Sequence, residues 1–204
     1  MNTLFEESPA TQGGQETVGG QDIKDQWQRV KSALREIVET VLLTLLIFFA
    51  IRSLIQNFHI QGTSMEPNLH HGQYLIVNKF VYYLHSPERG DIVVFHYPRN
   101  PRRDFIKRVI GLPGEKVEIR GKRLFINGEQ LEESGALNSS NYSWGPQRLA
   151  EDEYFVLGDN RNSSSDSHNW GPLPRDAIVG KAWISYWPPE YWGLVPHYSY
   201  AATE

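Results

Sequence analysis

The chain has 204 residues, of which 40% are hydrophobic and 22% are charged, as in an ordinary globular protein. Its formal net charge of −4 gives no sign of nucleic-acid binding, which requires a basic face. The absence of cysteine excludes disulfides, thiol nucleophiles and cysteine-containing zinc sites. The seven histidines form no H-x-x-x-H or H-E-x-x-H pattern, so we expect neither a metal nor a cofactor.

The N-terminal part consists of a tail and an amphipathic segment. Residues 1–20 are polar and glycine-rich, which predicts a disordered tail. Between residues 22 and 39, apolar side chains recur every three or four positions and predict a helix, beginning with Trp27 and Val30. We therefore expect residues 1–36 to form a cytoplasmic tail and amphipathic segment.

Residues 37–58 predict a transmembrane anchor. Only Glu39 and Arg52 are charged, and both lie toward the ends, where long side chains reach the membrane interface. The run is followed by "RSLIQNF" and not by a small-residue cleavage site, so we interpret it as an uncleaved anchor. Basic residues are concentrated before it, which predicts a single-pass protein with a cytoplasmic N-terminus and residues 59–204 outside the membrane.

Residues 59–204 predict a mainly β domain. Short runs rich in β-branched and aromatic residues alternate with turn signals such as Arg89-Gly90-Asp91 and Leu112-Pro113-Gly114. The expected strands are "QYLIVNKFVYYL", "GDIVVFHYP", "KVEIR", "RLFING", "YFVLGD" and "IVGKAWISYW". Two closely spaced turns predict a small β-meander at 117–132, followed by a loop at 133–148, so that a small insertion occupies about 117–150.

Ser64, in "IQGTSMEPNLHHGQ", is the first candidate catalytic residue. A serine in a loop is usually only a turn residue. A Ser–His–Asp arrangement would need a positioned histidine, but His70 and His71 stand beside a turn glycine and are typical of solvated loop residues.

Lys107, in "DFIKRVIGLPGE", is the candidate base. On a strand it shares a face with Phe105 and Val109, the face that we expect to be buried. Burial lowers the pKa of a lysine, and a neutral amine can accept a hydroxyl proton. Taken alone this pattern is weak, because strand lysines usually extend to solvent or form ion pairs.

A third polar stretch, "GDNRNSSSDSHNWGP" at residues 158–172, follows an apolar strand. Such a run is usually a surface loop. It also contains a hydroxyl that could orient an amine, Ser164, and carboxylates that could hold the loop, Asp159 and Asp166.

Together, "GTSMEP", "RGDIVVF", "DFIKRVIGLPGE" and "GDNRNSSSDSHNWGP" resemble, in order and spacing, the successive boxes of bacterial type I signal peptidases, or leader peptidases. The resemblance covers roughly residues 37–185. It implies an antiparallel β-sheet catalytic domain, preceded by one transmembrane helix. It also implies a membrane-anchored serine endopeptidase that removes signal peptides from exported preproteins after small residues of the Ala-x-Ala type.

The resemblance also implies roles for individual residues. Ser64 corresponds to the nucleophile and Lys107 to the general base of a Ser/Lys dyad. Supporting roles fall to Ser164, which would hydrogen-bond the amine, and to Asp159, Asp166 and Arg108. The shallow substrate pockets would be lined by Phe58, Ile60, Met65, Leu69 and Ile106.

Two positions depart from the family pattern. Gly62 stands where some members have a serine that stabilises the oxyanion, which leaves the Ser64 N–H as the expected donor. His168 stands where the family often has an arginine, so an Asp166–His168 pair would be charged only below about neutral pH.

The expected partners are exported preproteins and the lipid bilayer, with the protein acting as a monomer and without nucleic acid. Apolar residues near Trp187, Tyr191 and Trp192 could enter the membrane interface or pack within the domain. The sequence leaves two alternative functions. A self-cleaving repressor on the same fold would need a DNA-binding motif and would lack an anchor, and a membrane-tethered β-domain would bind partners without catalysis.

Overall fold

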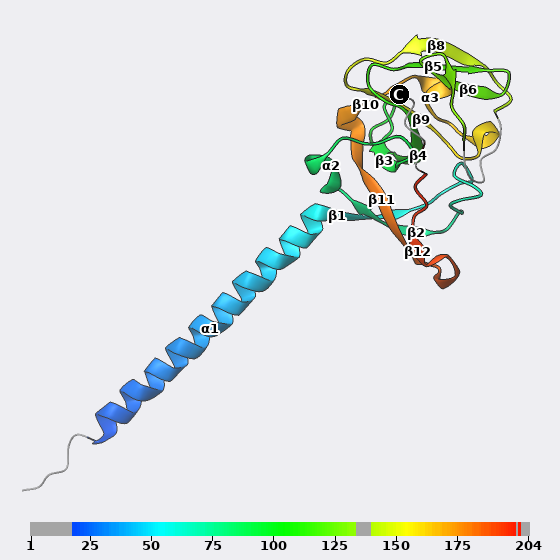
Figure 1. Ribbon diagram of the computed structural model, residues 1–204. Coiled ribbons are helices and arrows are strands. Elements are labelled where there is room, and N and C mark those ends of the chain that lie inside the picture. The colour runs from blue at the N-terminus through cyan, green and yellow to red at the C-terminus, as the bar shows by residue number, and fades with distance from the viewer. Residues whose placement is uncertain (1–17, 134–139, 199, 201–204) are drawn as a thin grey trace, which may run out of the picture. The chain divides into compact units, whose positions relative to one another are not determined.

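The computed structural model describes residues 18–133, 140–198 and 200. The chain divides into two compact units, residues 1–50 and 51–204. Helix α1 (Val18–Leu54) is continuous, and its part Gln26–Leu54 is long and apolar enough to cross a membrane, with a mean hydropathy of 2.1 (Figure 1). The predicted apolar helix at the N-terminal end is therefore confirmed.

Both ends of α1 differ from the prediction. The helix begins at Val18, so residues 18–20 of the expected disordered tail are helical, and residues 1–17 lie outside the described part. At the other end α1 stops at Leu54, and the last residues of the expected anchor belong to strand β1 (Ile55–His59). The reason is tertiary: β1 pairs along its whole length with β2, which hydropathy alone cannot reveal.

The second unit contains two antiparallel sheets. The larger has the strand order β1-β2-β11-β3-β4-β9-β10, with β12 paired to β11. Its members after β1 are β2 (Tyr74–Asn78), β3 (Ile92–His96), β4 (Asp104–Gly111), β9 (Glu153–Leu157), β10 (Leu173–Pro174), β11 (Ile178–Trp187) and β12 (Gly193–Leu194). Short helical elements connect them: η1 (Arg161–Ser163), α3 (Ser167–Trp170), η2 (Arg175–Ala177) and η3 (Pro189–Tyr191).

The smaller sheet is the predicted insertion. Its order is β7-β6-β5-β8, and its strands are β5 (Lys116–Arg120), β6 (Arg123–Ile126), β7 (Glu129–Gln130) and β8 (Trp144–Arg148). The first three form the expected β-meander. Residues 133–148 were expected to be a loop or part of the insertion, and β8 belongs to the insertion because it pairs with β5, while residues 134–139 lie outside the described part.

The expected strand "QYLIVNKFVYYL" ends early. After β2 the chain turns into the short helix α2 (Val81–Leu84). The turn is made by Asn78, whose Oδ1 accepts hydrogen bonds from the backbone N–H groups of Phe80 (3.0 Å) and Val81 (3.1 Å). A side chain that bonds the backbone two or three residues on competes with the sheet and starts a turn.

Candidate active site

Ser64 lies in the turn that follows β1. The backbone N–H of Asn160 donates to Ser64 O at 3.0 Å, so the loop after β9 is bonded directly to the serine turn. A Cβ atom on Gly158 would lie 2.4 Å from Ser64 O and 2.3 Å from Ser164 Oγ. Only glycine allows the two loops to approach this closely.

Lys107 lies in the middle of β4, between β3 and β9. The sequence predicted one buried face for this strand, but both faces are buried: Lys107 is 4% exposed and Arg108, which points the opposite way, is 0% exposed. Both faces of β4 are buried because each packs against a hydrophobic cluster: Ile106 belongs to one cluster and Val109, on the opposite face, to another.

The structure brings Ser64 and Lys107 into contact. Lys107 Nζ donates to Ser64 Oγ at 2.7 Å and to its own neighbour's carbonyl, Ile106 O, at 2.7 Å. Neither histidine of the serine turn is hydrogen-bonded to Ser64 Oγ in the described part of the chain. His70 packs its ring against Tyr191, with 4.8 Å between ring centroids, and His71 Nδ1 accepts the Gly62 N–H at 3.0 Å.

Burial lowers the pKa of Lys107 from 10.5 to about 8. Removing the ammonium from water disfavours the charged form, and this outweighs the nearby carboxylates of Asp166 and Asp159, which raise the pKa. The amine is therefore neutral in a substantial fraction of molecules at mildly alkaline pH, and a neutral amine 2.7 Å from a hydroxyl can take its proton.

On the other face of β4, Arg108 and Asp159 form a two-point ion pair. Arg108 Nε and Nη2 donate to the two carboxylate oxygens at 2.8 and 2.7 Å, and both side chains are 0% exposed. Arg108 Nη1 also donates to Gly90 O at 2.8 Å. Since a buried charge without its partner is strongly destabilising, the pair fixes the loop after β9 against the strand that carries the lysine.

Asp166 caps the N-terminus of α3 and also supports the site. Its Oδ2 accepts the Gly158 N–H at 2.9 Å, and its Oδ1 lies 2.5 Å from His168 Nδ1. The sequence left open whether Asp166 and His168 pair, and the structure brings them into contact. The predicted hydrogen bond from Ser164 to Lys107 is not present: Ser164 Oγ is buried and has no hydrogen-bond partner among the described residues, because Lys107 Nζ turns to Ser64 and Ile106 instead.

A groove of about 480 Å³ opens beside the two residues. It is lined by residues of β1 and the following turn and by residues of β4: Gln56, Asn57, Phe58, His59, Gln61, Ser64, Arg103, Asp104, Phe105, Ile106 and Lys107, with Ser165. Of the predicted pocket residues, Phe58 and Ile106 line it. Ile60, Met65 and Leu69 are not among its lining residues and are buried in the hydrophobic core, to which Ile106 also belongs, so their role in substrate binding stays a prediction.

The polar residues of this groove could not be recognised from the sequence. Gln56 and Asn57 fall at the end of the expected anchor and His59 just after it, and only their pairing with β2 makes them groove residues. Asn68, whose Nδ2 donates to Asp159 Oδ2 at 2.8 Å, carries no distinguishing signal in the sequence either. No group of three or more His, Asp or Glu side chains within the described ranges is placed to hold a metal ion.

A hydroxyl and a desolvated amine in contact, beside a groove, make the arrangement of an acyl-transfer site. The profile of "Signal peptidase, peptidase S26" matches residues 34–187. The chain therefore belongs to the S26 family of signal peptidases, which are enzymes that hydrolyse peptide bonds.

Individual relatives agree. The chain is 43% identical over 168 residues to a signal peptidase I of Leptolyngbya laminosa, covering 78% of this chain and 83% of the relative. It is 35% identical over 177 residues to signal peptidase I P of Bacillus subtilis subsp. natto, covering 80% of this chain and 95% of the relative. A crystal structure of a signal peptidase I from Enterococcus faecalis V583 is 34% identical, with a TM-score of 0.40, covering 47% of this chain and 96% of that one.

Proposed function

We propose that this protein is a membrane-anchored serine endopeptidase that removes signal peptides from exported preproteins, with Ser64 as nucleophile and Lys107 as general base. The single observation that carries this proposal is the 2.7 Å contact between Lys107 Nζ and Ser64 Oγ, made by a lysine whose pKa burial lowers to about 8. Family membership supports the substrate class.

The proposed reaction proceeds in two halves. The Ser64 hydroxyl gives its proton to the neutral Lys107 amine while Oγ forms a bond to the scissile carbonyl carbon. The resulting ammonium then protonates the leaving amine as the C–N bond breaks, which leaves an acyl-serine ester. In the second half, the neutral Lys107 amine takes a proton from a water molecule while the water oxygen bonds to the ester carbonyl carbon. The bond between this carbon and Ser64 Oγ then breaks, the Lys107 ammonium returns its proton to Oγ, and the product leaves as a carboxylic acid.

The oxyanion that forms in each half needs donors. The Ser64 N–H makes no hydrogen bond within the described part of the chain, so it is free to donate to the substrate. Gly62 carries no side chain, and its own N–H is held by His71. A single donor in such a site contributes about 3 kcal/mol to the transition state, so we assign the Ser64 N–H this role.

Cleavage after small residues fits the apolar lining near the nucleophile. Phe58 and Ile106 line the groove together with Ser64, and Ile60 and Met65 are buried in the hydrophobic core. A substrate with small side chains before the scissile bond would approach the nucleophile closely. We expect Ala-x-Ala sites to be cut and bulky residues there to be excluded.

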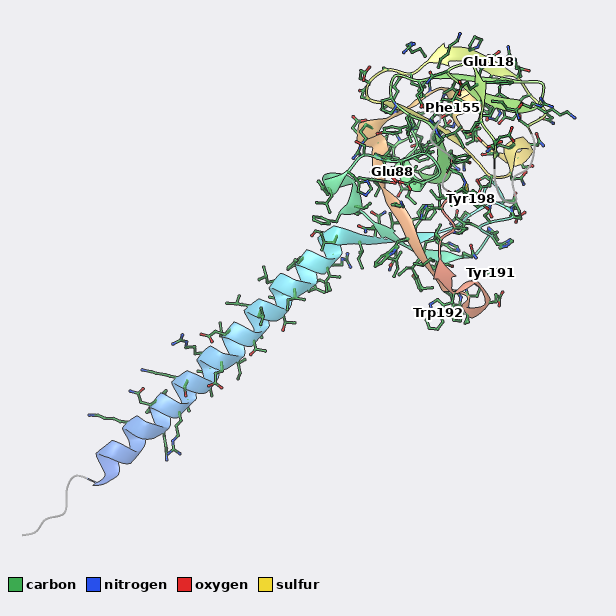
Figure 2. All side chains as sticks on the ribbon, in the orientation of Figure 1. Glu88, Glu118, Phe155, Tyr191, Trp192 and Tyr198 are labelled. Atoms are coloured by element: carbon green, nitrogen blue, oxygen red, sulfur yellow. The ribbon has the colours of Figure 1, made fainter. Side chains whose placement is uncertain are left out.

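The anchor serves to place the enzyme near its substrates. The apolar part of α1 ends at Leu54, ten residues before Ser64 in the sequence, and basic residues such as Lys31 and Arg35 precede it. We propose that the N-terminus is cytoplasmic and that residues 59–204 act on the outer face. Trp192 is 73% exposed on the turn labelled in Figure 2 and would enter the membrane interface.

The test uses the full chain in detergent, mixed with a preprotein whose signal peptide ends in Ala-x-Ala. We expect cleavage at that site by the unchanged protein, and loss of at least about a thousandfold in Ser64→Ala and in Lys107→Ala. His70→Ala and His71→Ala serve as matched controls in the same turn and should lose less than about tenfold. Substantial activity in Lys107→Ala would end the dyad mechanism, and binding without any cleavage would favour a binding domain.

A further inference from the structure

The C-terminal segment of the second unit, residues 195–198, packs across the strands that carry the active site. The Val195 N–H donates to Trp183 O of β11 at 2.9 Å, and His197 Nδ1 accepts the Ile92 N–H of β3 at 3.1 Å. Arg108 Nη1 of β4 donates to Pro196 O at 3.2 Å. Figure 1 shows this segment in red, returning from β12 into the body of the domain.

Tyr198, labelled in Figure 2, is the residue of this segment that reaches the active-site loops. Its ring stacks on the Arg108 guanidinium, with 4.2 Å between Cζ and the ring centroid. Its hydroxyl donates to Asn68 Oδ1 at 2.7 Å. Asn68 in turn donates from Nδ2 to Asp159 Oδ2 at 2.8 Å.

These contacts join three segments that are distant in the sequence. Asn68 lies in the same turn as Ser64, and the turn is closed by the Leu69 N–H bond to Met65 O at 2.9 Å. Asp159 is adjacent to Asn160, whose N–H holds Ser64 O. The Asn68 amide therefore bridges the serine turn and the carboxylate that is fixed against β4.

We propose that Tyr198 is a positioning residue for the nucleophile: its hydroxyl orients the Asn68 amide, and Asn68 then holds the Ser64 turn at the distance from Lys107 that proton transfer requires. An amide can present either its oxygen or its nitrogen, and a phenol donor at the oxygen directs the N–H group toward the carboxylate. Misplacing a nucleophile by about 1 Å costs up to a hundredfold in rate, so a looser turn lowers kcat. The inference rests on the proposed dyad of Ser64 and Lys107.

The test compares Tyr198 with Tyr200, which lies two residues further along the sequence, in the full chain in detergent. Tyr198→Phe removes a hydroxyl that bonds Asn68, whereas the Tyr200 hydroxyl is buried without a hydrogen-bond partner among the described residues, which makes Tyr200→Phe the matched control. We expect Tyr198→Phe to lower kcat about tenfold, with KM within about twofold, because the groove is unchanged while the attack geometry is not. The pH at which kcat/KM rises should stay the same, since the surroundings of Lys107 keep their charges.

A double-mutant cycle identifies the partner. If Tyr198 acts through Asn68, Tyr198→Phe should cause no further loss in an Asn68→Ala background. Wild-type kcat in Tyr198→Phe would overturn the proposal, as would an equal loss in Tyr200→Phe or full additivity with Asn68→Ala. A lower Tm with unchanged kcat below the transition would also overturn it. Activity in Ser64→Ala would instead refute the dyad, so the two failures are distinguishable.

Discussion

Lys107 is expected to lower the free energy of unfolding, and comparison with Lys107→Met measures by how much. Burial lowers its pKa from 10.5 to about 8, a difference of about 2.5 that corresponds to about 3 kcal/mol at pH values where the unchanged protein must bury an ammonium. Methionine fills a similar volume without the charge. It also leaves Ile106 O without its donor, which costs about 1 kcal/mol. At pH 6 the variant should therefore be more stable by about 2 kcal/mol.

The pH dependence is the sharper part of this prediction. Between pH 8 and 10.5 the unfolded chain binds one proton more than the folded chain at this position, so the stability of the unchanged protein rises with pH across that window. Between pH 6 and pH 9.5 it should rise by about 2 kcal/mol relative to Lys107→Met. Other groups titrate in both proteins and largely cancel in the comparison.

The assay is urea denaturation in detergent, followed by tryptophan fluorescence at pH 6 and at pH 9.5 for both proteins. The stabilised variant should at the same time be inactive at every pH, as is expected where function requires a strained group. A stability difference that stays constant between the two pH values would refute the reasoning, because it would mean that the lysine has the same pKa in the folded and the unfolded chain.

Three further predictions concern activity. The kcat/KM of the unchanged protein should rise with pH around the Lys107 pKa of about 8, because only the neutral amine is a base. The same rise should be seen in His168→Arg. If the rise disappears in this variant, it belongs to the Asp166–His168 contact and not to Lys107. Removing residues 1–54 should leave peptide cleavage intact but slow the cleavage of preproteins in vesicles. A longer truncation that also removes β1 should lower the Tm of the domain, because β2 loses its partner strand. Gly158→Ala should lower kcat at least tenfold in a peptide assay, because its Cβ would lie 2.4 Å from Ser64 O, and near-normal kcat would show that the loops can separate.

Much of the site could be predicted from residue types in sequence. The resemblance implied the roles of Ser64 and Lys107, and the structure places Ser64 Oγ 2.7 Å from Lys107 Nζ. Arg108 and Asp159 were both expected to support the site, and they form a buried ion pair. The hydroxyl of Ser164 could not be placed, because a resemblance gives the residue and not the rotamer, and in this chain the lysine amine bonds a backbone carbonyl instead.

Other assignments depend on packing, which residue types alone do not reveal. Ile60, Met65 and Leu69 are apolar whether they line a pocket or fill the core, and only the packing of the turn against the sheet decides between these roles. Residues 55–58 were counted with the apolar run that precedes them, yet they pair with β2 as a strand, and two of them, Gln56 and Asn57, line the groove.

The sequence by itself determined the elements that depend on local chemistry. These are the apolar helix, the alternating strands, the glycine turns and the identity of a serine and a lysine in separate motifs, because hydropathy and backbone preference act over a few residues. Only the tertiary structure decided that both faces of β4 are buried, which lowers the pKa of Lys107. It alone brought Tyr198 to Asn68, since contacts between residues so far apart in the chain depend on how the whole sheet is assembled.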